Sequence, residues 1–410
     1  MKIGLLTQWY APEPGPASLP TGLAEGLAAR GHEVTVLTGF PNYPHGRIAE
    51  GWKQQRRLDS QVNGVHVRRV ALYPNHDQSA LRRVANYASF AASARMSGLD
   101  AMADVDALWV NYSPVTVAWP MLALHRRGIP SVVHVLDLWP DTVLASGLGG
   151  GVGRIAERPL TALCDRMYDA GSVVAYISPG VGDVLASRGV PRDKLAYAPM
   201  WADEQVHQPQ PRATARGWDV ADDTLTVAYA GTLGGAQDLE TLIDACARVT
   251  DLDLMCLVAG SGTHEDELRE RARRVGASNV RFVGRLDADG MARLNATADV
   301  HYVGLNDHPL AATTMPSKVQ AVLASGRPIV GALVGDAADV VRQSGGAAVA
   351  PGDVDGLARH LRELSGQGRE EAARRGVLAR DFYEREFSFD TGASRVEDLL
   401  VKAAGGGRRG

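Results

Sequence analysis

The residue with the clearest capacity for chemistry is Lys318, at the predicted start of a short helix within residues 312–330, ATTMPSKVQAVLASGRPIV. Pro316 suits the entry to a helix, and a glycine and a proline end the helix before an apolar run. A helix N-terminus carries about half a positive unit charge. The ammonium of Lys318, Ser317 and the adjacent backbone N–H groups therefore predict a site for an anion.

Three glycine-containing loops have chemistry that suits a nucleotide: PEPGPAS (12–18), AGTLGGAQD (230–238) and AGSGTHEDE (259–267). Glycines let backbone N–H groups approach a phosphate, and a following helix adds a favourable dipole. One such loop is weak evidence, because most glycine turns are structural, but three on a repeated pattern are stronger. Neither a P-loop motif nor a strand-linked GxGxxG is present, which argues against a kinase or an ordinary dehydrogenase.

The elements expected to position these loops are parallel strands that alternate with helices. The first series of strand-like runs covers 2–8, 33–39, 66–72, 107–113, 131–137 and 173–179, and the second covers 225–231, 252–260, 280–286, 299–305, 327–333 and 346–352. A stretch rich in Pro, Gln and Asp at 197–223 separates them and predicts a linker. The fold class is thus α/β, with two Rossmann-like doubly wound domains facing across a cleft.

Composition limits the classes of function. With 410 residues, 45% of them hydrophobic, and a net charge of −4, the chain can build two domains and has no basic excess that would suggest nucleic acid. We expect a cytoplasmic location, because neither a membrane-spanning run nor a signal peptide is evident. Cys164, Cys246 and Cys256 lack metal-ligand spacing and are expected to be buried thiols.

Five segments together resemble glycosyltransferase family 4: 10–46, LDLWPD at 136–141, 175–195, YAGTLGGAQDLETLIDA at 229–245 and MPSKVQAVLASGRPIV at 315–330. They are most similar to its bacterial branch that transfers N-acetylated amino sugars. The resemblance spans nearly the whole chain in collinear order. It implies the GT-B architecture, a nucleotide-sugar donor, retention of anomeric configuration, and neither a cofactor nor a bound metal.

The resemblance also implies a division of labour. We expect an acceptor-binding domain at 1–198, completed by a C-terminal helix at about 385–404, a donor-binding domain at 199–384, and a flexible tail at 405–410. The expected donor-binding residues are Gly15, Gly231, Thr232, Gln237, Gly260, Gly262, Gly284, Arg285, Thr314, Met315, Pro316, Ser317, Lys318 and Ala321.

The sequence departs from the family pattern at its charged positions. The two glutamates that usually flank the equivalent of the 315–330 helix fall on Thr313 and Ala321, so the carboxylate that contacts the ribose is absent. The Arg and Lys that usually hold the diphosphate fall on Thr232 and Gln237, a basic pair that the similar branch often lacks as well. Lys318 is therefore the cation that we expect to bind the diphosphate.

The candidate catalytic residues are Asp137, Asp141 and His134. The family's histidine near the donor sugar falls on Asp137 by register, so the two aspartates are expected to bind sugar hydroxyls or to orient the acceptor. His134 lies earlier on the same predicted strand and has the alternative role of a satisfied core residue. Four Asp-x-Asp triplets begin at 104, 251, 287 and 353, but all lie at helix or turn boundaries, so we expect no metal site.

The predicted function is transfer of a sugar from a UDP-sugar, N-acetylglucosamine or a related amino sugar, to a hydroxyl or amine acceptor. Two alternatives remain: a GT-B sugar-nucleotide epimerase, and an inactive nucleotide-sugar-binding protein, which the missing carboxylates would suit. The sequence does not identify the acceptor or the oligomeric state.

A helix at 79–99 bears on whether the acceptor is lipid-linked. Leu81, Val84, Ala85, Ala88 and Ala92 recur at helical spacing, and the helix contains Arg82, Arg83 and Arg95. Because alanines dominate this face and few residues are basic, we expect it to pack on its own domain, with at most weak peripheral membrane contact. This favours a soluble acceptor over a lipid-linked one.

Overall fold

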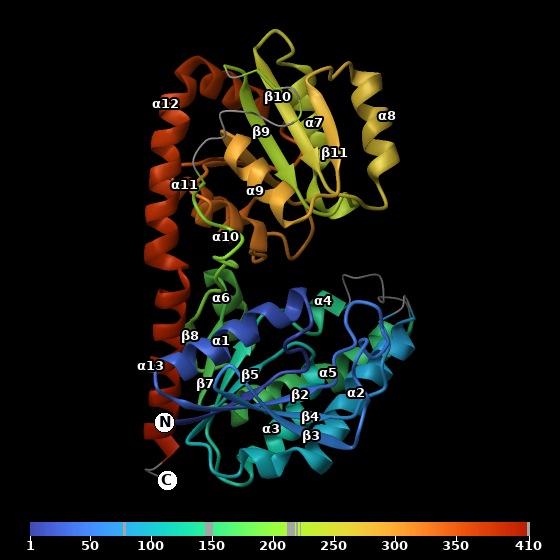
Figure 1. The fold of residues 1–410 in the computed structure, drawn as a ribbon, viewed down its shortest axis with the longest axis vertical. Helices are drawn as coiled ribbons and strands as arrows, with labels where there is room; N and C mark the ends of the chain where they lie inside the picture. The colour runs from blue at the N-terminus through green and yellow to red at the C-terminus, as the bar shows by residue number, and fades with distance from the viewer. Residues whose placement is uncertain (77–78, 144–150, 211–217, 219, 222, 408–410) are drawn as a thin grey trace. The chain divides into compact units, whose positions relative to one another are not determined.

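The chain forms two compact units in the computed structural model, which describes residues 1–76, 79–143, 151–210, 218, 220–221 and 223–407 (Figure 1). Unit 1 comprises Met1–Pro199 and Gly392–Gly410, and unit 2 comprises Met200–Thr391. Of the expected C-terminal tail, residues 408–410 lie outside the described residues, as do 211–217, 219 and 222 of the expected linker.

Unit 1 is built on an eight-stranded sheet in the order β3-β4-β2-β1-β5-β6-β7-β8. All neighbouring strands are parallel except β3 and β4, which form an antiparallel hairpin. The strands are β1 Lys2–Leu6, β2 Glu33–Gly39, β3 Arg57–Val62, β4 Val65–Val70, β5 Ala107–Asn111, β6 Ser131–Val135, β7 Val173–Tyr176 and β8 Leu195–Tyr197.

Unit 2 is built on a six-stranded parallel sheet in the order β11-β10-β9-β12-β13-β14. The order reverses between β9 and β12, and such a switch point is where open α/β sheets bind ligands. The strands are β9 Leu225–Ala230, β10 Leu254–Ala259, β11 Val280–Gly284, β12 Val300–Gly304, β13 Ile329–Ala332 and β14 Ala347–Val349.

The helices of unit 1 are α1 Ser18–Ala29, α2 Ala80–Ser97, α3 Ala118–His125, α4 Asp141–Val143, α5 Gly151–Ala170 and α6 Pro179–Ser187. Those of unit 2 are α7 Leu239–Ala247, α8 Glu265–Val275, α9 Ala288–Thr297, α10 Ser317–Ala324, α11 Gly335–Gln343 and α12 Val354–Glu386. The final helix, α13 Phe389–Gly407, begins in unit 2 and continues in unit 1.

All twelve predicted strands are present, and two strands were not predicted. β3 was not predicted because most of its residues are exposed and it has no apolar run. Its hairpin does have a signal, since Asn63 and Gly64 both adopt positive φ (49° and 80°) in a two-residue turn, the conformation that Asn-Gly favours. β8 has only three half-buried residues.

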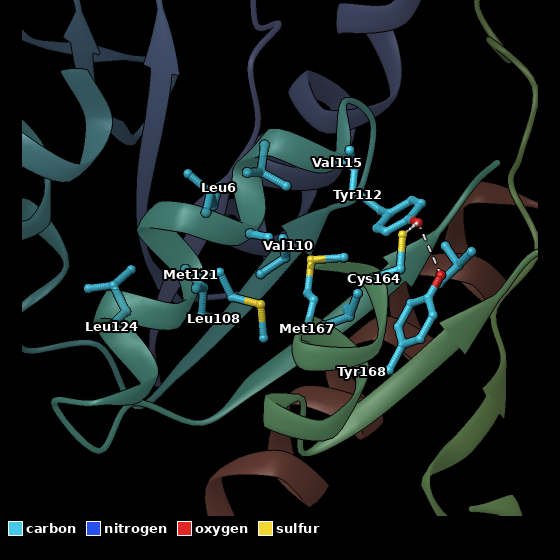
Figure 2. Close-up of a cluster of buried hydrophobic side chains, with 14 of the residues drawn as sticks. Leu6, Leu108, Val110, Tyr112, Val115, Met121, Leu124, Cys164, Met167 and Tyr168 are labelled. Carbon is cyan, nitrogen blue, oxygen red and sulfur yellow. Dashed lines mark hydrogen bonds between the residues drawn. The ribbon is translucent and has the colours of Figure 1, made fainter. Parts of the chain in front are cut away.

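The core of unit 1 packs the sheet against α3 and α5 (Figure 2). Met121 and Leu124 point inward from α3, and Met167 points inward from α5. Two buried polar groups in this core satisfy each other, since Tyr168 Oη donates to Tyr112 Oη over 3.0 Å and Tyr112 Oη lies 3.0 Å from Cys164 Sγ. Cys164, Cys246 and Cys256 are buried free thiols, as expected.

The C-terminal helix α13 is present, as the family resemblance implied. Its residues within unit 1 bury Ala393, Val396, Leu400 and Ala403, one face of a helix. Glu397 lies 2.9 Å from His32 Nε2. The buried face ends at Ala403, and Gly405 and Gly406 are exposed in the last turn of the helix, which reaches Gly407.

The helix α2 packs on its own unit, as expected, but through a different face from the one that carries the predicted apolar spacing. The apolar residues at helical spacing lie outward, with Leu81 78% exposed and Val84 56% exposed. The helix instead buries Asn86, Phe90 and Ala94. The physical reason is a polar anchor, because Asn86 accepts a hydrogen bond from Gln8 Nε2 (2.6 Å) and donates one to the carbonyl oxygen of Tyr73 (2.7 Å). No helix within the described part of the chain is long and apolar enough to cross a bilayer.

Candidate functional site

Lys318 is held at the first turn of α10, against the end of β9. Its Nζ donates a hydrogen bond to Tyr229 Oη (2.7 Å) and lies 4.4 Å from the centroid of the same ring. Tyr229 Oη in turn donates to the carbonyl oxygen of Thr232 (2.7 Å), which fixes its orientation. Burial lowers the pKa of the Lys318 ammonium to about 8, so the group stays charged at neutral pH. Tyr229, at the end of β9, thus holds the Lys318 ammonium in one orientation.

Gly231, directly after β9, makes room for this lysine. Its φ is +146°, and a Cβ at this position would lie 2.4 Å from Lys318 Cε and 2.6 Å from Nζ. A side chain here would therefore displace the lysine. The predicted importance of Gly231 has a specific cause, which is the close approach of α10 to the strand end.

Gly260 and Gly262 allow the loops after neighbouring strands to touch through their backbones. A Cβ on Gly260 would lie 1.8 Å from the carbonyl oxygen of Gly231, and one on Gly262 would lie 2.2 Å from that of Leu233. Backbone bonds join the same loops, including Leu233 N to Ser261 O (3.0 Å). These two glycines hold the loop beside Lys318 in place.

A cavity of about 200 Å³ opens between α9, α10 and the central strands of unit 2. It lies at the switch point of the sheet, because β9 and β12 both contribute to it. Its lining residues are His207, Ala230, Met291, Asn295, His301, Tyr302, Ser317, Lys318, Ala321 and Val322. The cavity therefore combines an apolar wall with a few polar groups and one cation, as small-molecule sites do.

The histidines of this cavity are neutral. Burial lowers the pKa of His301 to about 3, and burial also lowers the pKa of His207. His301 Nε2 is buried and has no hydrogen-bond partner among the described residues. Asn295 Nδ2 reaches Ser325 Oγ over 3.4 Å. A bound polar molecule could satisfy the imidazole nitrogen.

Ala321 and Thr313 occupy the positions where the family usually has its two glutamates. Ala321 lines the cavity one helical turn after Lys318. Thr313 donates a hydrogen bond from Oγ1 to the carbonyl oxygen of Leu310 (3.2 Å), so it stabilises its own turn. Lys318 has no ion pair with any residue that the structure describes, and its hydrogen bond and ring contact are both with the neutral side chain of Tyr229.

The other predicted donor-site residues of unit 2 lie on three loops. Thr232 and Arg285 are exposed, after β9 and β11 respectively, and Gly284 has φ of +77° with open space where a Cβ would be. Gln237 has a buried Oε1 with no hydrogen-bond partner among the described residues. Before α10, the Thr314 hydroxyl donates to the Leu310 carbonyl oxygen (2.7 Å), and Met315 and Pro316 are half-buried.

In unit 1 the structure places His134 in the core, where its ring is held by the backbone and by an aromatic neighbour. Its Nε2 donates to the carbonyl oxygen of Ala198 (2.9 Å), and its ring centroid lies 4.9 Å from that of Trp109. The ring is buried away from solvent, and this burial lowers its pKa to about 4. The ring is therefore neutral at pH 7. These contacts fit the alternative that His134 is a core residue whose hydrogen bond is satisfied.

The two aspartates after β6 differ. Asp137 is half-buried, and burial raises its pKa although a hydrogen bond from Ser113 opposes the shift. Asp141 begins α4 and forms an ion pair with Arg188, which also donates to the Trp139 carbonyl oxygen (2.9 Å). Asp141 therefore has a structural partner, and Asp137 is the stronger candidate for contact with a ligand.

Gly15 lies at the start of a short 3₁₀ turn with φ of +65° and is exposed. Its neighbour Glu13, for which no role was predicted, shapes this loop. The buried Glu13 carboxylate accepts backbone hydrogen bonds from Asn42 (2.7 Å), Tyr43 (2.8 Å) and Tyr10 (3.3 Å). Burial raises its pKa.

Aspartates of all four Asp-x-Asp triplets have structural partners. Asp106 accepts a backbone hydrogen bond from Lys2 (2.9 Å), and Asp251 forms an ion pair with an arginine of α12. Asp287 and Asp353 cap the N-termini of α9 and α12. Within the described ranges, no cluster of His, Cys, Asp and Glu is arranged to hold a metal ion.

Sequence reasoning missed Tyr229, Asn295, His207 and His301. Tyr229 could have been noticed, since it occupies the strand directly before the glycine loop. The others become neighbours only through folding, because they belong to the linker, α9 and β12.

Comparison with known proteins agrees with this arrangement. Residues 15–201 match the family described as Glycosyl transferase 4-like domain, and residues 224–367 match Glycosyl transferases group 1. WcaI of Escherichia coli strain K12, assigned as a glycosyl transferase to colanic acid biosynthesis, is 27% identical over 335 residues, which cover 80% of this chain and 82% of WcaI. An uncharacterized glycosyltransferase of Methanocaldococcus jannaschii is 24% identical over 87% of both chains.

Solved structures show the same fold. HepE of Anabaena, in complex with UDP and glucose, has a TM-score of 0.66 at 17% identity, covering 98% of this chain and 99% of HepE. Sucrose-phosphate synthase of Thermosynechococcus elongatus has a TM-score of 0.65 at 17% identity, covering 98% of each chain. With the two family matches spanning most of its length, the chain belongs to glycosyltransferase family 4 and has the GT-B fold.

Proposed function

We propose that this glycosyltransferase moves a sugar from a UDP-sugar to a hydroxyl or amine acceptor, with retention of configuration and without a metal ion. The observation that carries the proposal is the position of Lys318, a partly buried cation that lies against Gly231 at the switch point of unit 2. The UDP bound by the structurally similar HepE supports a uridine donor.

On the donor side, Lys318 and the first turn of α10 are proposed to bind the diphosphate. An ammonium with only neutral partners gains from a nearby phosphate, and the helix N-terminus adds to the attraction. Burial strengthens this interaction, because the surroundings screen charge less than water does. Tyr229 keeps the ammonium pointed at the strand end.

In the reaction, the bond between the anomeric carbon and the diphosphate oxygen breaks. The acceptor oxygen or nitrogen forms its bond on the same face of the sugar and loses its proton. Stabilising the charge on the leaving diphosphate lowers the barrier to this step, and Lys318 is the group proposed to do so. Asp137 is proposed to orient the acceptor or bind sugar hydroxyls, and Asp141 with its ion pair supports the loop after β6.

The proposed donor sugar is N-acetylglucosamine or a related amino sugar, as the motif resemblance implies. The similarity to WcaI is consistent with assembly of a polysaccharide. The acceptor is proposed to be either a soluble biosynthetic intermediate or a lipid-linked glycan, bound by unit 1.

The test is UDP release from a panel of UDP-sugars, measured with and without candidate acceptors. A transferase releases UDP rapidly only when donor and acceptor are both present. Sugar or an epimer released without acceptor would indicate an epimerase, and tight UDP binding without turnover of any donor would indicate a binding protein. Activity should persist in EDTA, and a loss that magnesium restores would contradict the metal-independent mechanism.

A further inference from the structure

His301 has a buried imidazole nitrogen with no protein partner in the described part of the chain. The residue is 3% exposed, and the unpaired atom is Nε2. A buried polar group without a partner is costly, so such a group in a folded protein usually binds something. His134 of unit 1 is also 3% exposed, but its Nε2 donates to the carbonyl oxygen of Ala198 (2.9 Å). His301 therefore differs from a core histidine that the backbone satisfies.

The position of His301 is the deep end of the cavity that contains Lys318. On β12 it pairs with Ala228 of β9, and that strand ends two residues later at Ala230. At about 3.3 Å per residue, His301 thus lies roughly 7 Å inside the strand end. Lys318 lies at the strand end itself, against Gly231. A ligand held by the ammonium can reach His301 only through a part that enters unit 2.

The size and charge of the cavity suit a small neutral group. Its volume of about 200 Å³ is below the range of about 300–1,000 Å³ that is typical of sites for whole drug-sized ligands, so it fits one part of a ligand. Lys318 is the one charged residue in the described lining, and His301 is neutral because burial lowers its pKa to about 3. The deep end therefore offers hydrogen bonds without a charge.

The neutral imidazole selects a hydroxyl among neutral groups. Depending on the tautomer, Nε2 either donates or accepts, and a hydroxyl can match both forms because it does both. Asn295 of α9 lines the cavity as a second neutral polar residue. Met291, Ala321 and Val322 supply apolar walls that suit the carbon atoms of a sugar ring. The lining thus has the chemistry of a pentose site.

The transfer reaction decides which part of a nucleotide-sugar can occupy this cavity. The anomeric carbon of the transferred sugar has to be reached by the acceptor, so this sugar has to stay outside the buried end. The other group bonded to the diphosphate is the ribose, which carries two neighbouring hydroxyls and does not react. With the diphosphate on Lys318, the ribose is the part that can extend toward His301.

We propose that the cavity beside Lys318 binds the ribose of the nucleotide and that His301 Nε2 recognises one of its hydroxyls. This inference rests on the proposed function, because the ligand is the nucleotide of the donor. It gives His301 a role in specificity, the distinction between ribonucleotides and deoxyribonucleotides. It also explains how a chain with Ala321 in place of a carboxylate holds the ribose, since a neutral group from β12 makes the contact.

The experiment is calorimetry of the full-length protein with UDP, 2′-deoxy-UDP and 3′-deoxy-UDP. We expect at least one deoxy analogue to bind roughly three- to tenfold more weakly than UDP, the effect of one hydrogen bond. Equal affinity for all three nucleotides would overturn the proposal, because a hydroxyl bound by the protein cannot be removed without a loss.

His301→Phe tests the assignment to this residue. The variant keeps a ring and removes Nε2, so it should bind UDP and the discriminated analogue with equal affinity. The matched control is His134→Phe, which removes an equally buried imidazole from unit 1 and should leave the discrimination unchanged. Discrimination that persists in His301→Phe would assign the hydroxyl to another group. Thermal unfolding identifies folding defects, and the comparison in the wild type requires no substitution.

Two substitutions at Ala321 test whether the nucleotide enters the cavity. Ala321→Leu fills the space and should weaken UDP binding by roughly tenfold or more, because overpacking at a filled site costs about 1–3 kcal/mol. Ala321→Ser is the control, since it adds only one atom and should retain most of the affinity. Unchanged UDP affinity in Ala321→Leu would show that the nucleotide lies outside the cavity and would refute the proposal.

Failure of the proposed function would give a different result. If the donor is not a UDP-sugar, UDP will not bind, and GDP with its 2′-deoxy and 3′-deoxy analogues then provides the same test, because the ribose is common to both nucleotides. If UDP binds and its analogues bind equally well, the proposed donor stands and the ribose contact with His301 is wrong.

Discussion

Two cations at strand ends, Arg69 in unit 1 and Lys318 in unit 2, show how the same location can serve structure or ligand binding. Arg69 is 2% exposed, donates to the carbonyl oxygens of Gly39 (2.9 Å) and Ala11, and stacks 4.7 Å from the centroid of Trp52. Among the residues that the structure describes, the one side-chain partner of Lys318 is the neutral hydroxyl of Tyr229. The guanidinium of Arg69 already binds carbonyl oxygens and an aromatic ring of the protein, whereas the ammonium of Lys318 can still bind an anion.

The same contrast is seen in the pKa values. Burial lowers the pKa of Arg69 to about 10, while the carboxylate of the nearby Glu13 favours its charged form. Burial lowers the pKa of Lys318 to about 8, and no carboxylate in the described part of the chain opposes this shift. An arginine stays charged at any physiological pH, so Arg69 suits a permanent structural role, whereas the charge on Lys318 depends on pH and on a bound anion.

The largest expected effect is on stability. Arg69→Leu should lower the free energy of unfolding by about 3 kcal/mol, because it leaves buried carbonyl oxygens unsatisfied and removes the cation that compensates Glu13. Denaturant titration monitored by tryptophan fluorescence measures the change, and Lys318→Met is the control. If Lys318→Met destabilised the protein as much as Arg69→Leu, the lysine would also be structural and the comparison would fail.

The next effect is on donor binding. Lys318→Ala should weaken UDP binding by about 1.5–3 kcal/mol, the range for hydrogen bonds to charged groups. Arg69→Leu, if it remains folded, should leave UDP binding by unit 2 unchanged. Isothermal titration calorimetry measures both, and unchanged affinity in Lys318→Ala would place the diphosphate elsewhere.

The third effect is on the pH dependence of UDP binding. The free ammonium of Lys318 loses its proton as pH rises through about 8, and the protonated form is the one that attracts phosphate. Affinity should therefore be constant from pH 7 to near 8 and decline above it, since phosphate groups are fully ionised by then, with a second pKa of about 6. Calorimetry across pH 7–9.5 tests this, and Lys318→Arg should abolish the decline. A decline that persists in Lys318→Arg would assign it to another group.

The smallest effect concerns the orientation of the lysine. Tyr229→Phe removes the hydroxyl that accepts from Lys318 Nζ and keeps the ring beneath it. UDP binding should weaken by about 0.5–1.5 kcal/mol, the net contribution of one hydrogen bond. Calorimetry on Tyr229→Phe and on the double variant with Lys318→Ala measures the coupling. Additive losses would mean that the two residues act separately.

The fold could be predicted from sequence because its strands are buried on both faces. Such strands appear as continuous apolar runs, and β9, β10 and β12 are of this kind. β3 was missed because an exposed edge strand has no such run. The sequence did not show which face of α2 is buried, because a polar residue, Asn86, decides it, and its partner Gln8 lies 78 positions away.

The candidate site could be predicted where chemistry and local structure coincide. Lys318 and Gly231 were identified because a helix start and a strand end can be recognised from neighbouring residues. Their contact depends on packing between segments 87 positions apart in sequence, Gly231 to Lys318, and only the structure reveals it. His134 shows the reverse case, since a histidine beside a predicted site proved to be satisfied by the backbone of Ala198.

The measurement that most directly tests the central claim is the affinity of UDP relative to uridine, determined by calorimetry for the wild type and for Lys318→Met. If Lys318 is the cation that binds the diphosphate, the wild type should prefer UDP, and the variant should lose about tenfold or more of that preference while its affinity for uridine stays the same. An undiminished preference in the variant, or an equal loss for both ligands, would contradict the account.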